Sequence, residues 1–330
     1  MVRNPRISGF LVLLGVLVAS PLLLVHAQEA QAPGGVAIIE PGQPQVVLHA
    51  TVQGAQQARD NGSLASTSND LYYHGGISGV GVETAPKVYL VLWGSQWNNN
   101  DPSGESALLQ SFYGHAGGSS WLNSVTQYCQ GVASGTYYCN GQGQAAGNQT
   151  GIYAGIWADN SSQSPSRPRQ SQIAAEAQRA AAHFGNTTAA QNASVQYVIA
   201  TAHGVSPQGF GTQYCAWHSS TSSSYGTLAY TNLPYITDAG ASCGANFNGL
   251  GPNAGITIVG GHEMGESITD QFPNGGWLDS GGAENGDKCA WIQSGQGASA
   301  NVTMNGATFP VQSLWSNAFN SGAGGCVLSY

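Results

Sequence analysis

The sequence predicts an α+β domain built around a mixed β-sheet, and three observations support this fold class. Two apolar, β-rich runs, Lys87–Trp93 and residues 194–202, are typical of buried strands. Between them, residues 171–184 are rich in alanine and precede Gly185, which predicts a long helix with a glycine at its end. A further helix is expected within residues 255–291, a window that holds six of the chain's 16 acidic residues.

The first 70 residues are expected to lie outside this domain. A basic start, an apolar run and small residues at the expected cleavage point are typical of a secretory signal peptide over residues 1–27. Residues 28–70 are rich in Gln, Ala, Gly and Pro, which favours a propeptide or a disordered leader, with a plain linker as the alternative. Residues 71–330 then form the single domain, and no later stretch is long and apolar enough to span a bilayer.

Two shorter helices are expected near the start of the domain. Asp101 or Ser103 is suited to cap a helix over residues 105–113, because short polar side chains satisfy the first free N–H groups of a helix. Ser120 is suited to begin another short helix that ends near Tyr128.

The stretch between the second buried strand and the acidic window is expected to be loop and edge strand. Residues 204–224 are predicted to be a loop that carries His218. Residues 227–236 are predicted to be an edge strand, because Pro234 lacks the N–H that an interior strand donates. After residue 291, short strands and turns are expected.

Cysteine content and charge indicate an exported protein. An even number of cysteines predicts disulfides in an oxidising compartment, and no two have the C-x-x-C spacing of a zinc–thiolate cluster. Three disulfides between nearest neighbours are expected: Cys129–Cys139, Cys215–Cys243 and Cys289–Cys326.

The net charge narrows the class of partner. Without the two signal-peptide arginines, six Lys and Arg face 16 Asp and Glu, so the mature chain carries a charge near −10. This argues against nucleic acid and anionic membranes as partners. We expect a secreted, extracellular monomer whose partner is a protein or peptide substrate.

The acidic window opens with His262-Glu263-x-x-Glu266. On a helix, His262 and Glu266 lie one turn apart on the same face, with Asp270 one turn further, while Glu263 lies about 100° round the axis. This is the spacing of the zinc-peptidase motif H-E-x-x-H with the second His replaced by Glu. In that motif the intervening Glu is the general base, a role we expect for Glu263.

A third ligand is expected downstream of the helical pair. Glu284 is the best candidate, because thermolysin-like zincins place a Glu roughly twenty residues after the pair, with an Asp shortly after it, here Asp287. Asp279 is the rival ligand. Asp270, Asp279 and Asp287 are expected to orient ligands by hydrogen bonds. The extra carboxylate makes the site harder, so calcium is the alternative to zinc.

Some residues of the chain are compatible with other chemistries. His218 lies beside Trp217 and is a candidate electrophile or hydrogen-bond donor to the transition state. An intact Gly-x-Ser-x-Gly nucleophile elbow is absent, which argues against Ser-His-Asp catalysis. Glycoside hydrolysis by a carboxylate pair remains an alternative, with the pair drawn from Glu263, Glu266, Asp279 and Glu284.

Three motifs carry a resemblance to a known family: Val88–Gly94 (VYLVLWG), Gly261–Glu266 (GHEMGE) and Glu284–Cys289 (ENGDKC). Together they resemble the EXORDIUM or phosphate-induced protein family over about residues 71–330. The resemblance implies a secreted, disulfide-bearing protein, in plants tied to cell expansion and growth signalling. It implies no settled enzymatic activity, and it supports His262, Glu266 and Glu284. The long Gln- and Ala-rich leader and the Asn-rich loops depart from the plant pattern.

The order strand, helix, strand, edge strand and motif helix is compatible with a zincin-like domain with disulfide-stapled loops. In such a domain the edge strand beside the motif helix holds substrate by strand addition. We therefore expect a secreted zinc metallopeptidase, a hydrolase of peptide bonds. The alternative is a non-catalytic, EXORDIUM-like binding or signalling protein with a structural calcium or no metal.

Overall fold

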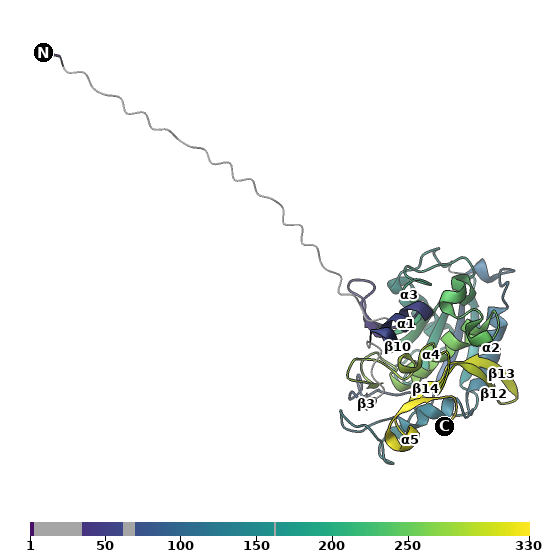
Figure 1. The fold of residues 1–330 in the computed structure, drawn as a ribbon. Coiled ribbons are helices and arrows are strands. Elements are labelled where there is room, and N and C mark those ends of the chain that lie inside the picture. Colours follow the sequence, from purple (N-terminus) through teal and green to yellow (C-terminus); the bar gives the residue numbers. More distant parts are fainter. Residues whose placement is uncertain (3–34, 62–69, 162) are drawn as a thin grey trace. The chain divides into compact units, whose positions relative to one another are not determined.

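A seven-stranded mixed sheet forms the framework of the fold (Figure 1). Strands β10, β8, β4 and β7 run parallel to one another, whereas β1, β2, β9 and β10 pair antiparallel in that order. This arrangement confirms the predicted α+β class with a mixed sheet. In spatial order the strands are β1 (Gly35–Ala37), β2 (Val46–Ala50), β9 (Tyr214–Ser223), β10 (Gly226–Leu233), β8 (Val195–Thr201), β4 (Lys87–Trp93) and β7 (Tyr153–Asp159).

The computed structural model describes residues 1–2, 35–61, 70–161 and 163–330. All helices and strands described belong to the unit that spans Ala32–Tyr330. The predicted signal peptide lies, beyond its first two residues, outside the described residues. Within the described ranges, no helix combines the length and apolar character that crossing a membrane requires.

The two apolar runs form the predicted strands, and the surrounding chain corrects two expectations. Strand β8 is buried along its whole length. Residues 204–224 were expected to be a loop, but residues 214–223 form β9, because strand pairing on both sides satisfies its polar backbone. Strand β10 was expected at an edge, yet it lies between β9 and β8. Pro234 follows the last residue of β10, Leu233, so it removes no hydrogen bond from the sheet.

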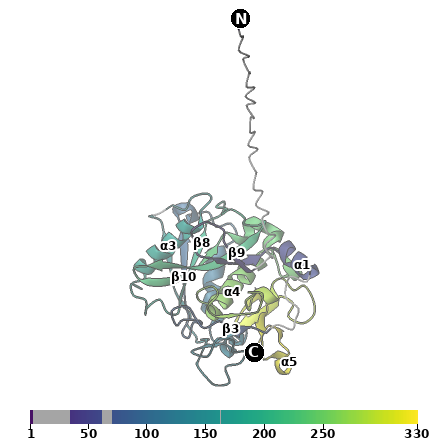
Figure 2. The same ribbon diagram turned by 90° about the vertical axis from the view of Figure 1, so that its left-hand side faces the viewer.

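Helices cover both faces of the sheet (Figure 2). Successive residues of a strand point to opposite faces. On β9, His218 faces α4 (Ala254–Thr269), where it contacts Glu263, while Trp217 faces away and packs edge-on against Tyr230. Tyr230 in turn contacts Gln170, the first residue of α3 (Gln170–His183), so α3 lies on the opposite face from α4. The predicted alanine-rich helix is thus confirmed as α3.

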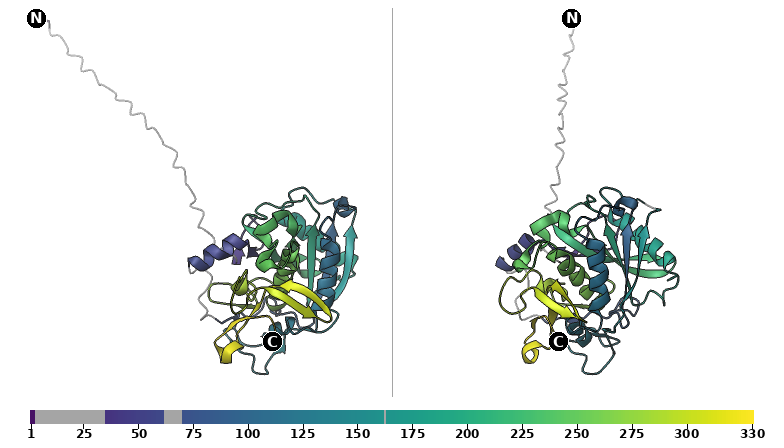
Figure 3. Two further views of the ribbon diagram at one scale, coloured as in Figure 1. Left: turned by 45° about the vertical axis from the view of Figure 1, so that its right-hand side comes forward. Right: turned by 90° about the vertical axis from the view of Figure 1, so that its right-hand side faces the viewer.

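Helix α4 is the centre of the molecule, and all 16 of its residues are buried. Glycines let its neighbours approach closely: a Cβ on Gly261 would lie 3.0 Å from the rings of Phe112 and Trp121. Phe112 belongs to α2 (Glu105–Ala116), which is capped by Asp101 as predicted through the N–H groups of residues 105 and 106. Figure 3 shows α2 and the hairpin of β12 (Ala300–Met304) and β13 (Ala307–Val311) beside α4.

Shorter elements complete the domain. The expected short helix before Cys129 is the 3₁₀-helix η2 (Leu122–Gln127). Two-stranded pairings are β3 (Tyr72–Tyr73) with β11 (Trp277–Leu278), β5 (Cys129–Gln130) with β6 (Gln144–Ala145), β12 (Ala300–Met304) with β13 (Ala307–Val311), and β14 (Leu314–Ser316) with β15 (Gly325–Val327). The remaining helical turns are α1 (Val52–Asp60), η1 (Ser95–Trp97), η3 (Ile236–Cys243), η4 (Phe247–Gly249), η5 (Asp287–Cys289) and α5 (Phe319–Gly322).

All three predicted disulfides form between nearest neighbours: Cys129–Cys139, Cys215–Cys243 and Cys289–Cys326. The bond between Cys289 and Cys326 ties the 3₁₀-turn η5 to strand β15. Disulfides of this number are typical of exported proteins, which agrees with a secreted chain.

The described part of the expected leader is ordered, which corrects the prediction of a disordered segment. Residues 35–61 form β1, β2 and α1, and β2 pairs with β9 as part of the main sheet. All five residues of β2 are buried. The Gln- and Ala-rich composition was misleading because β2 is stabilised by pairing with a strand that is distant in sequence, and composition carries no signal for such pairing.

Candidate metal centre

Seven ionisable side chains meet on one side of β9, and none is more than 2 % exposed. Helix α4 contributes three of them, strands β9 and β2 contribute one each, and η5 with the loop before it contributes two. They are His262, Glu263 and Glu266 from α4, His218 from β9, His49 from β2, Glu284 from the loop and Asp287 from η5. The helical spacing predicted from H-E-x-x-E is confirmed, because His262 and Glu266 lie one turn apart on the same helix.

The short nitrogen–oxygen distances fall into two sets. Among the described residues, His262 with Glu266 and Asp287, and His218 with Glu263 and Glu266, form groups that could hold an ion, and neither group includes Glu284. On one side of Glu266, His262 Nε2 lies 3.0 Å from Glu266 Oε1 and 3.9 Å from Asp287 Oδ1. On the other side, His218 Nδ1 lies 3.6 Å from Glu266 Oε2, and His218 Nε2 lies 3.5 Å from Glu284 Oε2. Ligand atoms of a tetrahedral zinc site are about 3.3–3.5 Å apart, given bonds of about 2.0–2.1 Å.

Unpartnered polar atoms test whether a cation fits here. The buried atoms without a hydrogen-bond partner include His262 Nε2, Glu266 Oε2 and both carboxylate oxygens of Glu284. His218 Nε2 and Glu263 Oε1 share this property. Leaving such groups buried and unpaired is costly, and a divalent cation would satisfy several at once. The donor set of imidazole and carboxylate suits zinc and, with more oxygens, calcium.

The hydrogen bond at Nδ1 of His262 determines which ring nitrogen could bind an ion. Gln312 Nε2 donates to the Gly286 carbonyl at 2.9 Å, so the amide oxygen of Gln312 faces His262. His262 Nδ1 lies 3.2 Å from that oxygen and therefore donates its proton to it. The second ring nitrogen, Nε2, then carries a lone pair directed toward Glu266. Gln312 was not predicted, because a lone Gln in a C-terminal strand segment gives no spacing signal.

Burial dominates the electrostatics of the cluster. Desolvation raises the pKa of Glu266 to about 7 and raises the pKa values of Glu284 and Asp287 well above their usual range. Burial also lowers the pKa of His262. Burial disfavours the ionised form of these carboxylates. A bound cation would offset that cost by its attraction to them and would hold them ionised.

Glu263 and His218 form a hydrogen-bonded pair at the centre of the cluster. His218 Nδ1 lies 3.2 Å from Glu263 Oε2. Burial alone lowers the pKa of His218, but the carboxylates of Glu284 and Glu263 outweigh it and raise that pKa well above its usual value. Burial raises the pKa of Glu263, and the hydrogen bond from His218 opposes the shift. This pair can therefore exchange a proton.

The loop before η5 positions the acidic ligands through its backbone. The Asp287 N–H donates to Glu266 Oε1 at 2.8 Å, and the Glu284 N–H donates to Asp287 Oδ2 at 3.2 Å. Asn285 Nδ2 donates to the carbonyl of Gly265 at 3.1 Å, which ties the loop to α4. Asp287 thus holds Glu266 and the Glu284 backbone by hydrogen bonds, while its other oxygen, Oδ1, belongs to the ligand group with His262 and Glu266.

The other two predicted acids, Asp270 and Asp279, accept hydrogen bonds from backbone N–H groups and belong to none of the possible ligand groups of the described residues. Asp279 Oδ2 pairs with Lys288 Nζ at 2.8 Å, and Asp279 Oδ1 accepts from the N–H groups of residues 281 and 283. Asp270 ends α4 and accepts from the backbone N–H groups of residues 274, 275 and 276. Both carboxylates shape the loop that follows the motif helix.

His49 is the member of the cluster that the sequence did not predict. Its ring stacks on His262 with a centroid distance of 3.7 Å and an angle of 4° between the planes. Both ring nitrogens are buried without a hydrogen-bond partner, and His49, His262 and Glu263 form one of the groups able to hold an ion. A histidine inside the apolar run VVLHA was the available signal, but the run was assigned to the leader.

Comparison with protein-family models, with curated proteins and with solved structures finds no match for this chain. Function is therefore inferred from the side chains of the cluster and from their surroundings.

Proposed function

We propose that the chain is a secreted metal-dependent peptidase, with zinc held by His262, Glu266 and Glu284. The observation that carries this proposal is the set of unpartnered, fully buried atoms on these three residues. Asp287 is the alternative third ligand, because His262, Glu266 and Asp287 form a group whose ligand atoms lie within 4.8 Å of one another, whereas Glu284 Oε2 faces His218 Nε2 at 3.5 Å. A bound zinc ion would lower the pKa of a coordinated water and polarise a peptide carbonyl.

Glu263 is suited to act as the general base. It follows His262 on α4, and its Oε1 has no hydrogen-bond partner. That oxygen can accept a proton while Oε2 stays hydrogen-bonded to His218. His218 would then stabilise the ionised Glu263 and donate to an oxygen on which negative charge develops.

The surrounding fold supports the zincin-like part of the proposal. Zincins place a motif helix against a mixed sheet and hold an extended substrate along the antiparallel edge strand. Here β9 is antiparallel to β10, passes beside α4 and supplies His218. A motif helix beside a mixed sheet supports the proposal, although β9 is covered by β2 on its outer side and the acid in place of the second His adds negative charge.

A second candidate function is a non-catalytic, EXORDIUM-like binding protein with a structural calcium. The burial of the cluster favours it, because Glu263 and His218 are each 1 % exposed and no substrate atom can reach them in this arrangement. Among the unpartnered atoms of His262, Glu266 and Glu284, three are oxygens and one is a nitrogen, which suits a hard cation.

Elemental analysis and one matched pair of variants distinguish the two functions. Purified protein should contain one equivalent of zinc and should cleave casein in a chelator-sensitive manner at some pH between about 3 and 8, the range over which Glu and His titrate. Glu263→Gln should retain the melting temperature and lose hydrolysis, whereas Asp238→Asn, a change in an exposed acid paired with His203, should leave hydrolysis unchanged.

One equivalent of calcium, together with no hydrolysis by the wild-type chain or by a chain freed of residues 35–61, would establish the binding protein instead. Retention of hydrolysis by Glu263→Gln would remove Glu263 from the mechanism while leaving the ion site intact.

A further inference from the structure

We propose that the face of β9 beside α4 is a binding groove for an extended peptide, and that β2 occupies this groove in the intact chain. The inference rests on the proposed function and explains how a fully buried site can act on a polypeptide. The observation that carries it is the position of His49, which β2 places directly over the proposed ligand His262.

Strand β2 lies along β9 as a bound peptide would. The two strands pair antiparallel, with Val47 opposite His218 and His49 opposite Ala216. Residues directly opposite in an antiparallel pair point to the same face. Val47 and His49 therefore face α4, and His49 covers the site at the point where His262 and Glu263 meet. Addition of an extended peptide to an exposed strand is a general mode of recognition.

Without β2, strand β9 would be the edge of the sheet. The sheet order places β2 between β9 and the three-residue strand β1, so β9 is paired on its outer side by residues 46–50 alone. An edge of this kind offers free N–H and C=O groups to an incoming strand. A substrate that replaced β2 would form the same ladder and would bring its backbone to Glu263.

Hydrogen bonds hold the segment on both sides of β2. Before the strand, the Ser171 N–H and Oγ donate to Glu40, and Gln170 Nε2 donates to the Pro44 carbonyl. Helix α1 buries only Ala55 and Ala58. Arg59 donates to the carbonyls of Ala290 at 2.6 Å and Trp291 at 3.0 Å, and it is the main polar link between α1 and the loop after η5.

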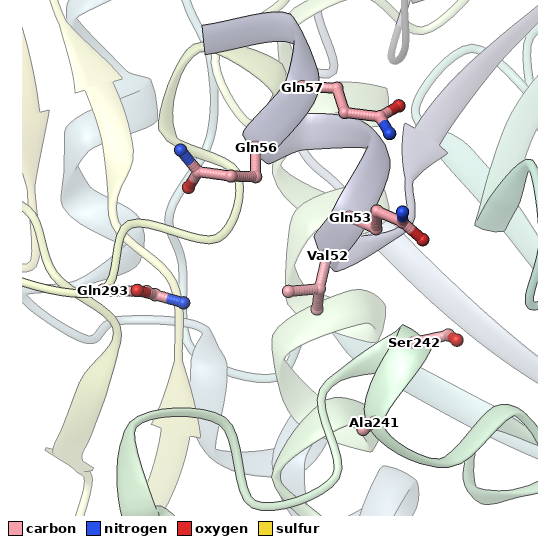
Figure 4. Close-up of a pocket in the computed structure, with 7 residues that line it drawn as sticks. All are labelled: Val52, Gln53, Gln56, Gln57, Ala241, Ser242 and Gln293. Atoms are coloured by element: carbon pink, nitrogen blue, oxygen red, sulfur yellow. The ribbon is translucent and has the colours of Figure 1, made fainter. Parts of the chain in front are cut away.

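Beside α1 the packing is open (Figure 4). A pocket separates the helix from η3 and from Gln293, and three glutamines of α1, Gln53, Gln56 and Gln57, line it. Helix α1 is therefore packed less closely against the domain than β2, which is buried along its length.

The first test uses point variants of the intact chain. Arg59→Ala removes both links to the loop after η5 and should raise casein hydrolysis several-fold, since the segment then leaves the groove more often. Gln57→Ala changes an exposed residue of the same helix and should leave hydrolysis at the wild-type rate. Hydrolysis that falls in Arg59→Ala would show that the segment supports the site rather than covers it.

The second test measures binding without relying on hydrolysis. A protease recognition sequence replaces residues 62–69, and the two-piece protein is mixed with a fluorescein-labelled peptide of residues 35–61. The labelled peptide should exchange into the groove, and a His49→Ala version should bind roughly two- to tenfold more weakly through loss of ring stacking. Unlabelled extended peptides from casein should compete with it.

The outcomes separate this inference from the proposed function. Exchange and competition without any hydrolysis would keep the groove and remove the peptidase. Hydrolysis that does not change on cleavage, with no exchange of the labelled peptide, would overturn the groove and keep the peptidase. Unfolding of the two-piece protein when the segment dissociates would show that β2 is a permanent strand, and would also overturn the inference.

Discussion

Gly286 offers a direct test of the ion site, because a single methyl group added there would enter it. Its backbone angles, φ −79° and ψ −44°, are those of an ordinary helical residue, so alanine fits the backbone without strain. A Cβ at this position would lie 2.8 Å from Glu266 Oε1 and 2.8 Å from His262 Nδ1, well inside the 3.4–4 Å of ordinary contact. The substitution Gly286→Ala therefore acts on two proposed ligands at once.

Neither side chain can move away freely. Glu266 Oε1 accepts the Asp287 N–H at 2.8 Å, and His262 Nδ1 is held by Gln312 Oε1 at 3.2 Å. The methyl group must lengthen one of these contacts or push the loop outward. We expect the affinity for the ion to fall by about 10–100-fold, the usual effect of disturbing groups that orient ligands. The free energy of unfolding should fall by about 1–3 kcal/mol, as for other overpacked sites.

Gly114→Ala is the matched control. Gly114 lies inside α2, and a Cβ there would meet nothing within 4 Å. Alanine should raise the free energy of unfolding by about 0.5–1 kcal/mol through helix propensity and leave ion affinity unchanged. Calorimetric titration of chelator-treated protein with zinc and with calcium, together with urea unfolding, measures both effects. Wild-type affinity in Gly286→Ala would refute an ion held between His262 and Glu266.

Two further predictions concern stability. Burial raises the pKa of Glu105 to about 8 from an ordinary 4.5. The folded state therefore keeps its proton to higher pH, and wild-type stability should fall as pH rises from about 4.5 to 8, by at most about 1.4 kcal/mol per pH unit. Glu105→Gln should flatten that profile in urea unfolding, and equal slopes would contradict the assignment. Replacing Cys289 and Cys326 by serine opens a loop of 37 residues and should cost about 2–4 kcal/mol in denaturant unfolding. Ion affinity should fall as well, because Cys289 anchors the turn that holds Asp287; unchanged affinity would mean that other contacts hold the loop.

Local signals explain what the sequence predicted well. The run Lys87–Trp93 is apolar throughout and flanked by Pro86 and Gly94, so its strand assignment needed no knowledge of its partners. The spacing of His262 and Glu266 has meaning only on a helix, and a helix places them together whatever surrounds it. Cysteines close in sequence paired because short connections between them cost little entropy.

Non-local pairing explains what the sequence did not predict. Nothing in residues 46–50 indicates β9 as a partner, and so His49 could not be placed at the site. Strand β9 itself is rich in serine, and its burial follows from neighbours on both sides rather than from its composition. Gln312 contacts His262 only because β13 packs beside α4. In each case a tertiary contact determines the role, and the residue type alone is compatible with a surface loop.

The burial of α4 links ion binding to the folded state. A helix that carries His262, Glu263 and Glu266 would ordinarily turn them toward water, but every residue of α4 is buried. Ionised carboxylates taken out of water cost several kcal/mol each unless a cation or a hydrogen-bond donor offsets the loss. The ion would therefore contribute to folding as well as to chemistry, as in other proteins whose metal site is absent from the unfolded chain.

The same burial limits which substrates could be used. A peptide that reaches Glu263 must first displace β2, and the free energy of that displacement is subtracted from its own binding. A short peptide forms too few hydrogen bonds with β9 to offset the loss of a five-residue strand. An unfolded polypeptide can match the whole ladder and place a side chain where His49 now lies. The proposed peptidase would thus favour extended protein substrates over small peptides, because only they can match the ladder that β2 forms with β9.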